Sequence, residues 1–219
     1  MAKRFLIVLA LILAFFAVWS ILLLLFIVIA GNNDSALMLG ILVAMGLIIV
    51  TFIPWLNFAI EKAFTFRGEG RPASTEALKQ EIETINQYDV PVTVKQKGDK
   101  LIVTWRYVDA KWWELMARAG LKKIYELHIK FDDKHKLAKL IDFQKSVSWR
   151  AGTPGKVSLS GGFTRSGVVF EYEIGKAWGI RENFAPGKVY DYTFTPGEIK
   201  NPVMNTILRH GWTVQFALW

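Results

Sequence analysis

Two long apolar segments at the start of the chain restrict its fold more than any other feature of the sequence. Residues 5–30 and 36–60 form stretches of 26 and 25 residues without a charged side chain. A helix needs about 20 such residues to cross a bilayer. The five residues between the segments, 31–35, are enough only for a tight turn. The sequence therefore predicts a transmembrane helical hairpin over residues 1–60.

A cleaved signal peptide and a pair of core helices in a soluble protein are the alternatives to this hairpin. The hydrophobic region of a signal peptide is usually about 7–15 residues long. The first segment exceeds that length, and no small-x-small cleavage site ends it before the second segment begins. Both segments are apolar on every face, whereas a surface helix of a soluble protein has a polar face. The transmembrane hairpin explains both segments better.

Basic residues lie at one side of the predicted hairpin. Lys3 and Arg4 precede the first segment, Lys62, Arg67 and Arg71 follow the second, and the turn between them has no basic residue. Cytoplasmic loops of membrane proteins carry an excess of Lys and Arg. We therefore expect a multi-pass protein of the cell (inner) membrane with both termini in the cytoplasm.

Small residues recur every four positions in the second segment, at Ala36, Gly40 and Ala44. This spacing puts them on one helix face and lets another helix approach closely in lipid. That helix is either the first helix of the same hairpin, through the bulky residues at 21–26, or a helix of another subunit. Carriers and proton relays need ionisable groups at membrane depth, and neither segment has one, so a channel or carrier would require oligomerisation.

Residues 74–219 are long enough for one folded domain, and residues 61–73 are expected to form an interfacial linker. Five residues in or next to this linker are candidates for contact with the membrane surface: Lys62, Phe64, Phe66, Arg67 and Arg71. From Glu61 onward, the chain carries 25 basic and 18 acidic residues, because only Lys3, Arg4 and Asp34 are charged before it. A basic residue near an anionic membrane surface contributes about 1 kcal/mol of attraction. Membrane lipids are therefore expected partners, whereas nucleic acid is not, because the basic residues are dispersed.

Hydropathy periodicity predicts that residues 74–219 form an α+β domain, with a mainly antiparallel β-sheet of seven or eight strands and about three short helices. The expected helices cover residues 75–87, 110–119 and 201–210. The expected strands cover residues 90–94, 101–107, 125–131, a long strand ending near 149, and 157–159, 168–174, 189–195 and 212–219. The last of these is apolar on both faces, so we expect it inside the sheet.

No catalytic pattern stands out in this domain. Glu171 and Glu173 share a face of an expected strand, and Asp132, Asp133 and His135 share an expected turn. Solvent-exposed strands and turns commonly contain such groups. The absence of cysteine excludes disulfides and Cys-ligated metals. We therefore expect no catalytic residue, cofactor or metal site, which favours a protein that is not an enzyme.

Trp112 and Trp113 are adjacent in an expected helix and point about 100° apart. Both are buried only if that helix is covered on two sides; otherwise one faces a partner or the membrane interface. We expect a membrane-anchored accessory, scaffold or assembly subunit whose basic, aromatic-rich cytoplasmic domain binds a membrane-protein partner or self-associates. The alternative is a membrane-tethered β-rich domain, with or without enzymatic activity, that binds a lipid or another amphipathic ligand in an apolar cavity.

Overall fold

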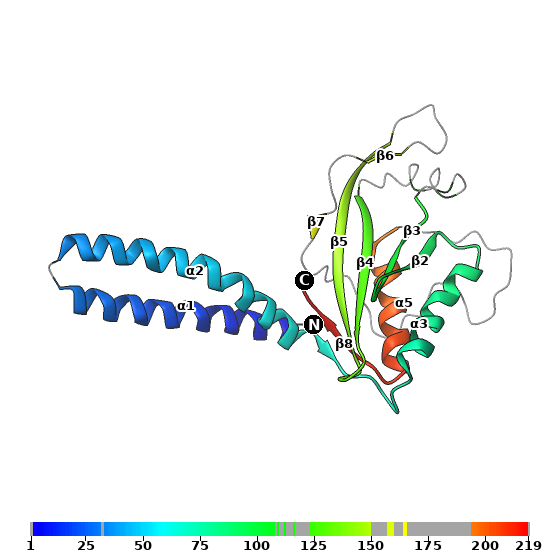
Figure 1. Ribbon diagram of the computed structural model, residues 1–219, viewed down its shortest axis with the longest axis horizontal. Helices are drawn as coiled ribbons and strands as arrows, with labels where there is room; N and C mark the ends of the chain where they lie inside the picture. The colour runs from blue at the N-terminus through cyan, green and yellow to red at the C-terminus, as the bar shows by residue number, and fades with distance from the viewer. Residues whose placement is uncertain are drawn as a thin grey trace. The chain divides into compact units, whose positions relative to one another are not determined.

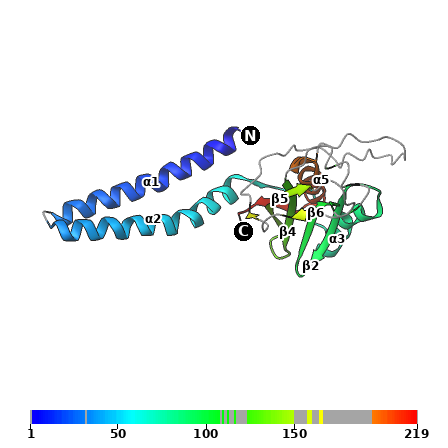
Figure 2. The same cartoon turned by 90° about the horizontal axis from the view of Figure 1, so that it is seen from above.

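The computed structural model describes residues 2–31, 33–107, 109, 112, 116, 123–149, 157–159, 164–165 and 194–218. The chain divides into two compact units, residues 1–64 and 65–219. The first unit consists of two antiparallel helices, α1 (Ala2–Ala30) and α2 (Asp34–Ala63) (Figures 1 and 2). At 1.5 Å per residue each helix is about 45 Å long. Both are long and apolar enough to cross a membrane.

The two helices of the first unit pack along a stripe with a spacing of three or four residues. On α1, the half-buried or buried side chains are Arg4, Val8, Leu11, Ile12, Phe15, Trp19, Leu23, Phe26 and Ala30. The Phe15 ring lies 5.5 Å from the Phe52 ring and 5.8 Å from the Trp55 ring. Trp55 Nε1 also donates a hydrogen bond to the Leu11 carbonyl of α1, at 2.9 Å. Aromatic contacts and this bond hold the hairpin together.

The second unit is built around a mixed β-sheet with the strand order β1-β8-β5-β4-β3-β2. Its strands are β1 (Thr65–Phe66), β2 (Val92–Lys97), β3 (Lys100–Trp105), β4 (Lys123–Asp132), β5 (Leu137–Trp149), β6 (Val157–Leu159), β7 (Thr164–Arg165) and β8 (Thr213–Phe216). Strands β5 and β8 are parallel, and the other pairs are antiparallel. Strand β8 lies between β1 and β5, which confirms that the last strand is inside the sheet. The α+β class is also confirmed.

Helices α3 (Thr75–Glu83) and α5 (Pro196–Arg209) cover one face of this sheet (Figure 1). The core lies between them and the sheet, and its fully buried members include Leu78, Ile82, Leu101, Val103, Leu127, Ile129, Val203 and Ile207. The Ser74 side chain caps α3 by accepting the Ala77 amide, as its position before an amphipathic segment predicts. The 3-10 helix η1 (Thr84–Gln87) completes the expected helix over residues 75–87.

Two residues of the segment after α2, Thr65 and Phe66, form a strand of the sheet. Strand β1 pairs with β8, and the Glu69 and Ala73 amides donate to carbonyls near the end of α5, at 3.1 and 3.0 Å. Gly68 lies so close to β8 that a Cβ there would be 2.4 Å from the Trp212 carbonyl oxygen. Periodicity did not indicate these contacts, because the paired residues are about 150 positions apart in the chain.

Helix α5 begins at Pro196, so the predicted start of this helix at residue 201 is wrong. Thr195 and Glu198 form a capping box, in which the Thr195 amide donates to Glu198 Oε2 at 3.3 Å. This arrangement satisfies free amides of the first turn, so the helix starts earlier and Pro202 lies inside it. Phe194 and Thr195 are outside any strand. The predicted helix over 110–119, apart from helical Trp112 and Met116, and the strands over 168–174 and 189–193 lie outside the described residues.

Candidate binding surface

The face of the sheet opposite α3 and α5 carries a line of lysines on four neighbouring strands. They occupy directly paired positions on β2, β3, β4 and β5, and we call them the lysine row: Lys97, Lys100, Lys130 and Lys139. The same line continues to Gln215 on β8 and Thr65 on β1. Paired residues point to the same face, with Cβ atoms about 5 Å apart.

Like charges at directly paired positions oppose folding. Such pairs destabilise a sheet. Lys97 and Lys130 are exposed, while Lys100 and Lys139 are half-buried. Lys139 also makes a further interaction, so exposed Lys97 and Lys130 are the members of the row best suited to an anionic partner.

Two acidic side chains of the described strands on this face, Glu126 and Asp132, contact histidines. Glu126 Oε2 lies 2.9 Å from His128 Nε2, and the other ring nitrogen of His128 lies 3.3 Å from Lys100 Nζ. The His128 ring also stacks on Phe143, with centroids 4.1 Å apart. Asp132 Oδ2 lies 2.7 Å from His135 Nδ1, and hydrogen bonds from His135 lower the pKa of this carboxyl. Both carboxylates therefore lie against histidines.

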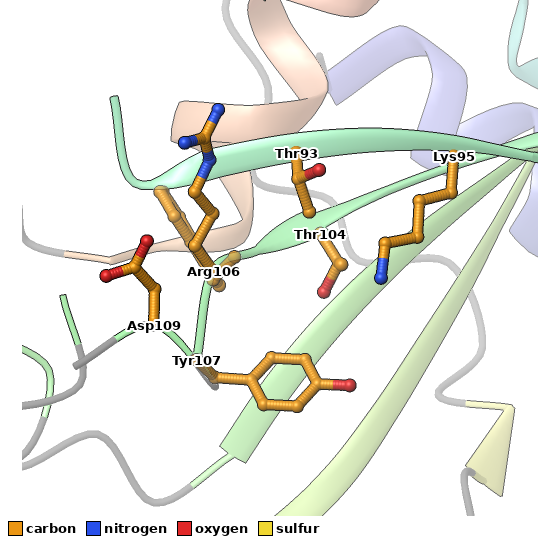
Figure 3. A pocket seen from close by; sticks show the side chains of 7 residues that line it. Thr93, Lys95, Thr104, Arg106, Tyr107 and Asp109 are labelled. Atoms are coloured by element: carbon orange, nitrogen blue, oxygen red, sulfur yellow. The ribbon is translucent and has the colours of Figure 1, made fainter. Parts of the chain in front are cut away.

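A small pocket of about 280 Å³ lies at one end of this face (Figure 3). It is lined by Thr93, Lys95, Thr104, Trp105, Arg106, Tyr107 and Asp109. Lys95, Thr104 and Tyr107 project into it, whereas the Arg106 guanidinium points away (Figure 3), its Nε donating to the Val92 carbonyl at 3.0 Å. Burial, and secondarily the charge of Glu126, raises the pKa of the Tyr107 phenol. This lining suits small polar groups better than a lipid tail.

A buried polar cluster lies on the other side of the sheet, between it and α5. Lys200 Nζ donates to Asp142 Oδ2 at 2.6 Å, and the Tyr125 hydroxyl donates to Asp142 Oδ1 at 2.5 Å. The Lys200 and Asp142 side chains are 0% and 3% exposed. No solvent path reaches groups so completely covered, so we assign this cluster a structural role.

No protein-family model, curated protein or solved structure matches this chain.

Sequence reasoning missed both the lysine row and the buried cluster. The Lys97–Lys100 pair follows from the two-residue turn between β2 and β3, and hairpin register could have revealed it. The other pairs depend on how separate strands align, which periodicity does not report.

The small residues of α2 lie within the hairpin. Ala36, Gly40 and Ala44 are half-buried, and the Phe26 ring of α1 lies directly over Gly40. A Cβ on Gly40 would be 2.1 Å from the Phe26 Cζ. This packing favours the first alternative from the sequence, in which the small residues contact the first helix of the same hairpin.

The other predicted contact residues are divided between buried and exposed positions. Trp112 is 7% exposed and belongs to the core, while Trp113 lies outside the described residues. Phe64 and Phe66 are both buried. The Phe64 ring packs edge-on against Phe5, with centroids 5.5 Å apart, and the Phe66 ring is tilted against Phe216, with centroids 5.6 Å apart. Lys62, Arg67 and Arg71 are all exposed. Contact of these residues with the membrane or a partner stays a prediction.

The acidic turn between β4 and β5 holds its carboxylates with protein groups. Asp133 accepts hydrogen bonds from Lys136, at 2.6 Å, and from Thr75, which lower the pKa of its carboxyl. Within the described part of the chain there is no group of three or more His, Asp or Glu arranged to hold a metal ion. Glu171 and Glu173 lie outside that part.

Proposed function

We propose that this protein is a membrane-anchored scaffold or accessory subunit that holds its α+β domain at the membrane surface for a membrane-protein partner. The observation behind the anchor is the distribution of apolar surface. Among the described residues, every exposed large apolar side chain belongs to α1 or α2. Soluble monomers rarely expose apolar patches larger than a few hundred Å², so a bilayer is the natural environment for these helices.

A binding role is favoured over catalysis by what the described residues offer. The strongest cluster of ionisable groups, around Lys200, is sealed in the core, and the pocket beside Tyr107 is small. Two lysines of the row, Lys97 and Lys130, are in contrast exposed.

The proposed orientation places both termini in the cytoplasm, because Lys3, Arg4 and Lys62 flank the helices on one side. A tag fused after Trp219 tests it. Protease added to intact cells should leave this tag untouched and should digest it in inside-out membrane vesicles. A tag inserted at Ser35 serves as the control with the opposite behaviour. Digestion of the C-terminal tag on intact cells would overturn the orientation.

Affinity capture of the full chain tests the proposed partner. After cross-linking in native membranes and extraction in a mild detergent, we expect a second membrane protein, or a second copy of the chain, in stoichiometric yield. An unrelated tagged hairpin controls for nonspecific capture. Recovery of the 24.9 kDa chain alone, as a monomer by light scattering, would contradict the proposal.

A further inference from the structure

We infer that the lysine row binds the phosphate groups of anionic lipids in the membrane that the hairpin crosses. The inference rests on the proposed membrane anchor and identifies the surface that contacts the lipid. Four ammonium groups follow one another across β2, β3, β4 and β5. At about 4.8 Å per strand, they span roughly 14 Å of the sheet.

The lysine row lies on the same line of paired positions as Thr65 in β1, the first strand of the sheet. Thr65 pairs with Gln215, and Gln215 pairs with Lys139. Lys139 is therefore two strand spacings from Thr65, about 10 Å, and Lys97 is five spacings away, about 24 Å. Only Phe64 separates β1 from the end of α2. The lysine row therefore lies about 10 to 24 Å along the sheet from the strand that follows α2.

The chemistry of the row fits lipid phosphates better than other anions. Lysine is a flexible point charge without the fixed fork of arginine, which suits mobile headgroups that present no single geometry. The row contains no aromatic side chain to stack on nucleic-acid bases. Its continuation through Gln215 and Thr65 is polar and offers no apolar anchor of the kind that dominates protein interfaces.

The expected strength follows from the charge of the row. One basic residue near an anionic surface changes the ratio of docked to undocked domain about fivefold. Replacing two lysines by glutamine should therefore lower this ratio about thirtyfold. The Debye length is about 8 Å at physiological ionic strength and about 3 Å at 1 M, so high salt should release the domain.

Energy transfer in nanodiscs tests the inference with the full chain. The sequence contains no cysteine, so Asp99→Cys, in the exposed turn beside the row, gives a single site for a donor dye. The acceptor is a labelled lipid. We expect more transfer when phosphatidylglycerol is added to phosphatidylcholine, and loss of this gain at high salt or in the variant Lys97→Gln/Lys130→Gln.

The matched control is Lys79→Gln/Lys123→Gln, which removes the same charge. Lys79 is on α3, across the sheet from the row, and Lys123 is at the opposite end of β4, about 23 Å from Lys130. The control should keep the lipid dependence. Three results would overturn the inference. The first is equal energy transfer with and without phosphatidylglycerol, and the second is an equal loss of transfer in the row variant and the control variant. The third is a row variant that keeps its lipid-dependent transfer but no longer captures a protein partner. Failure of the chain to enter the nanodiscs would instead refute the membrane anchor.

Discussion

The buried pair of Lys200 and Asp142 allows a quantitative test of the core. Lys200→Met removes the ammonium group and keeps the length of the side chain, so Asp142 Oδ2 loses the donor that lies 2.6 Å away. Because the Asp142 side chain is 3% exposed, water does not replace that donor. Breaking a buried ion pair in this way costs about 3–5 kcal/mol.

The effect should be visible in thermal unfolding of the full chain in detergent, followed by tryptophan fluorescence. For a domain of this size, 1 kcal/mol shifts the midpoint by about 2–4 °C. Lys200→Met should therefore lower the midpoint by about 6–20 °C. Tyr125→Phe, which removes one hydrogen bond to the carboxylate, should cost about 1.5–3 kcal/mol.

A triple variant distinguishes the cost of leaving the Asp142 carboxylate without its donor from the cost of removing all three polar groups. Lys200→Met/Asp142→Leu/Tyr125→Phe replaces all three polar groups with apolar ones, which is often neutral or stabilising for buried ion pairs. We expect it to recover most of the stability lost in Lys200→Met. If Lys200→Met cost less than about 1 kcal/mol, a typical net contribution of a neutral hydrogen bond, the pair would not be desolvated and the reasoning would be wrong.

Three further predictions follow from local contacts. Gly40→Leu should separate α1 from α2 by displacing Phe26, and should reduce cross-linking between engineered cysteines on the two helices; Gly46→Leu, with no atom within 4 Å of the added Cβ, should not. Thr195→Ala removes the capping box of α5 and should cost about 1 kcal/mol, or about 2–4 °C in the same unfolding assay. The lowered pKa values of Asp132 and Asp133 contribute stability that is present above the unfolded pKa of about 3.9 and lost as the pH falls through the folded values. Asp132→Asn/Asp133→Asn should therefore flatten the pH dependence of the midpoint below about pH 4, and an unchanged slope would contradict this account.

The features that the sequence predicts well are those fixed by local periodicity. The length and apolar character of α1 and α2 follow from two uncharged segments, and the β2–β3 hairpin follows from alternation around Gly98, whose φ is +63°. The short strand over residues 157–159 is also where a run of strand-forming residues predicts it. Each of these signals lies within a few residues of the element it defines.

The features that the sequence did not predict depend on distant contacts or on competing caps. Helix α5 has two prolines near its start, Pro196 and Pro202, and a helix could begin at either of them. The capping box formed by Thr195 and Glu198 places the start at Pro196. The lysine row and the partners of Lys200 come from strands and helices that are far apart in the chain. Alternation gives the face of each lysine within its strand, but not its neighbours.

The pairing of β1 with β8 has a consequence for how the protein is made. Strand β1 is translated about 150 positions before β8, its hydrogen-bonded partner. The β1–β8 pairing therefore forms only after β8 has left the ribosome, long after α1 and α2 have been translated. A variant that could not form β8 would keep both helices but would lose the strand that lies between β1 and β5.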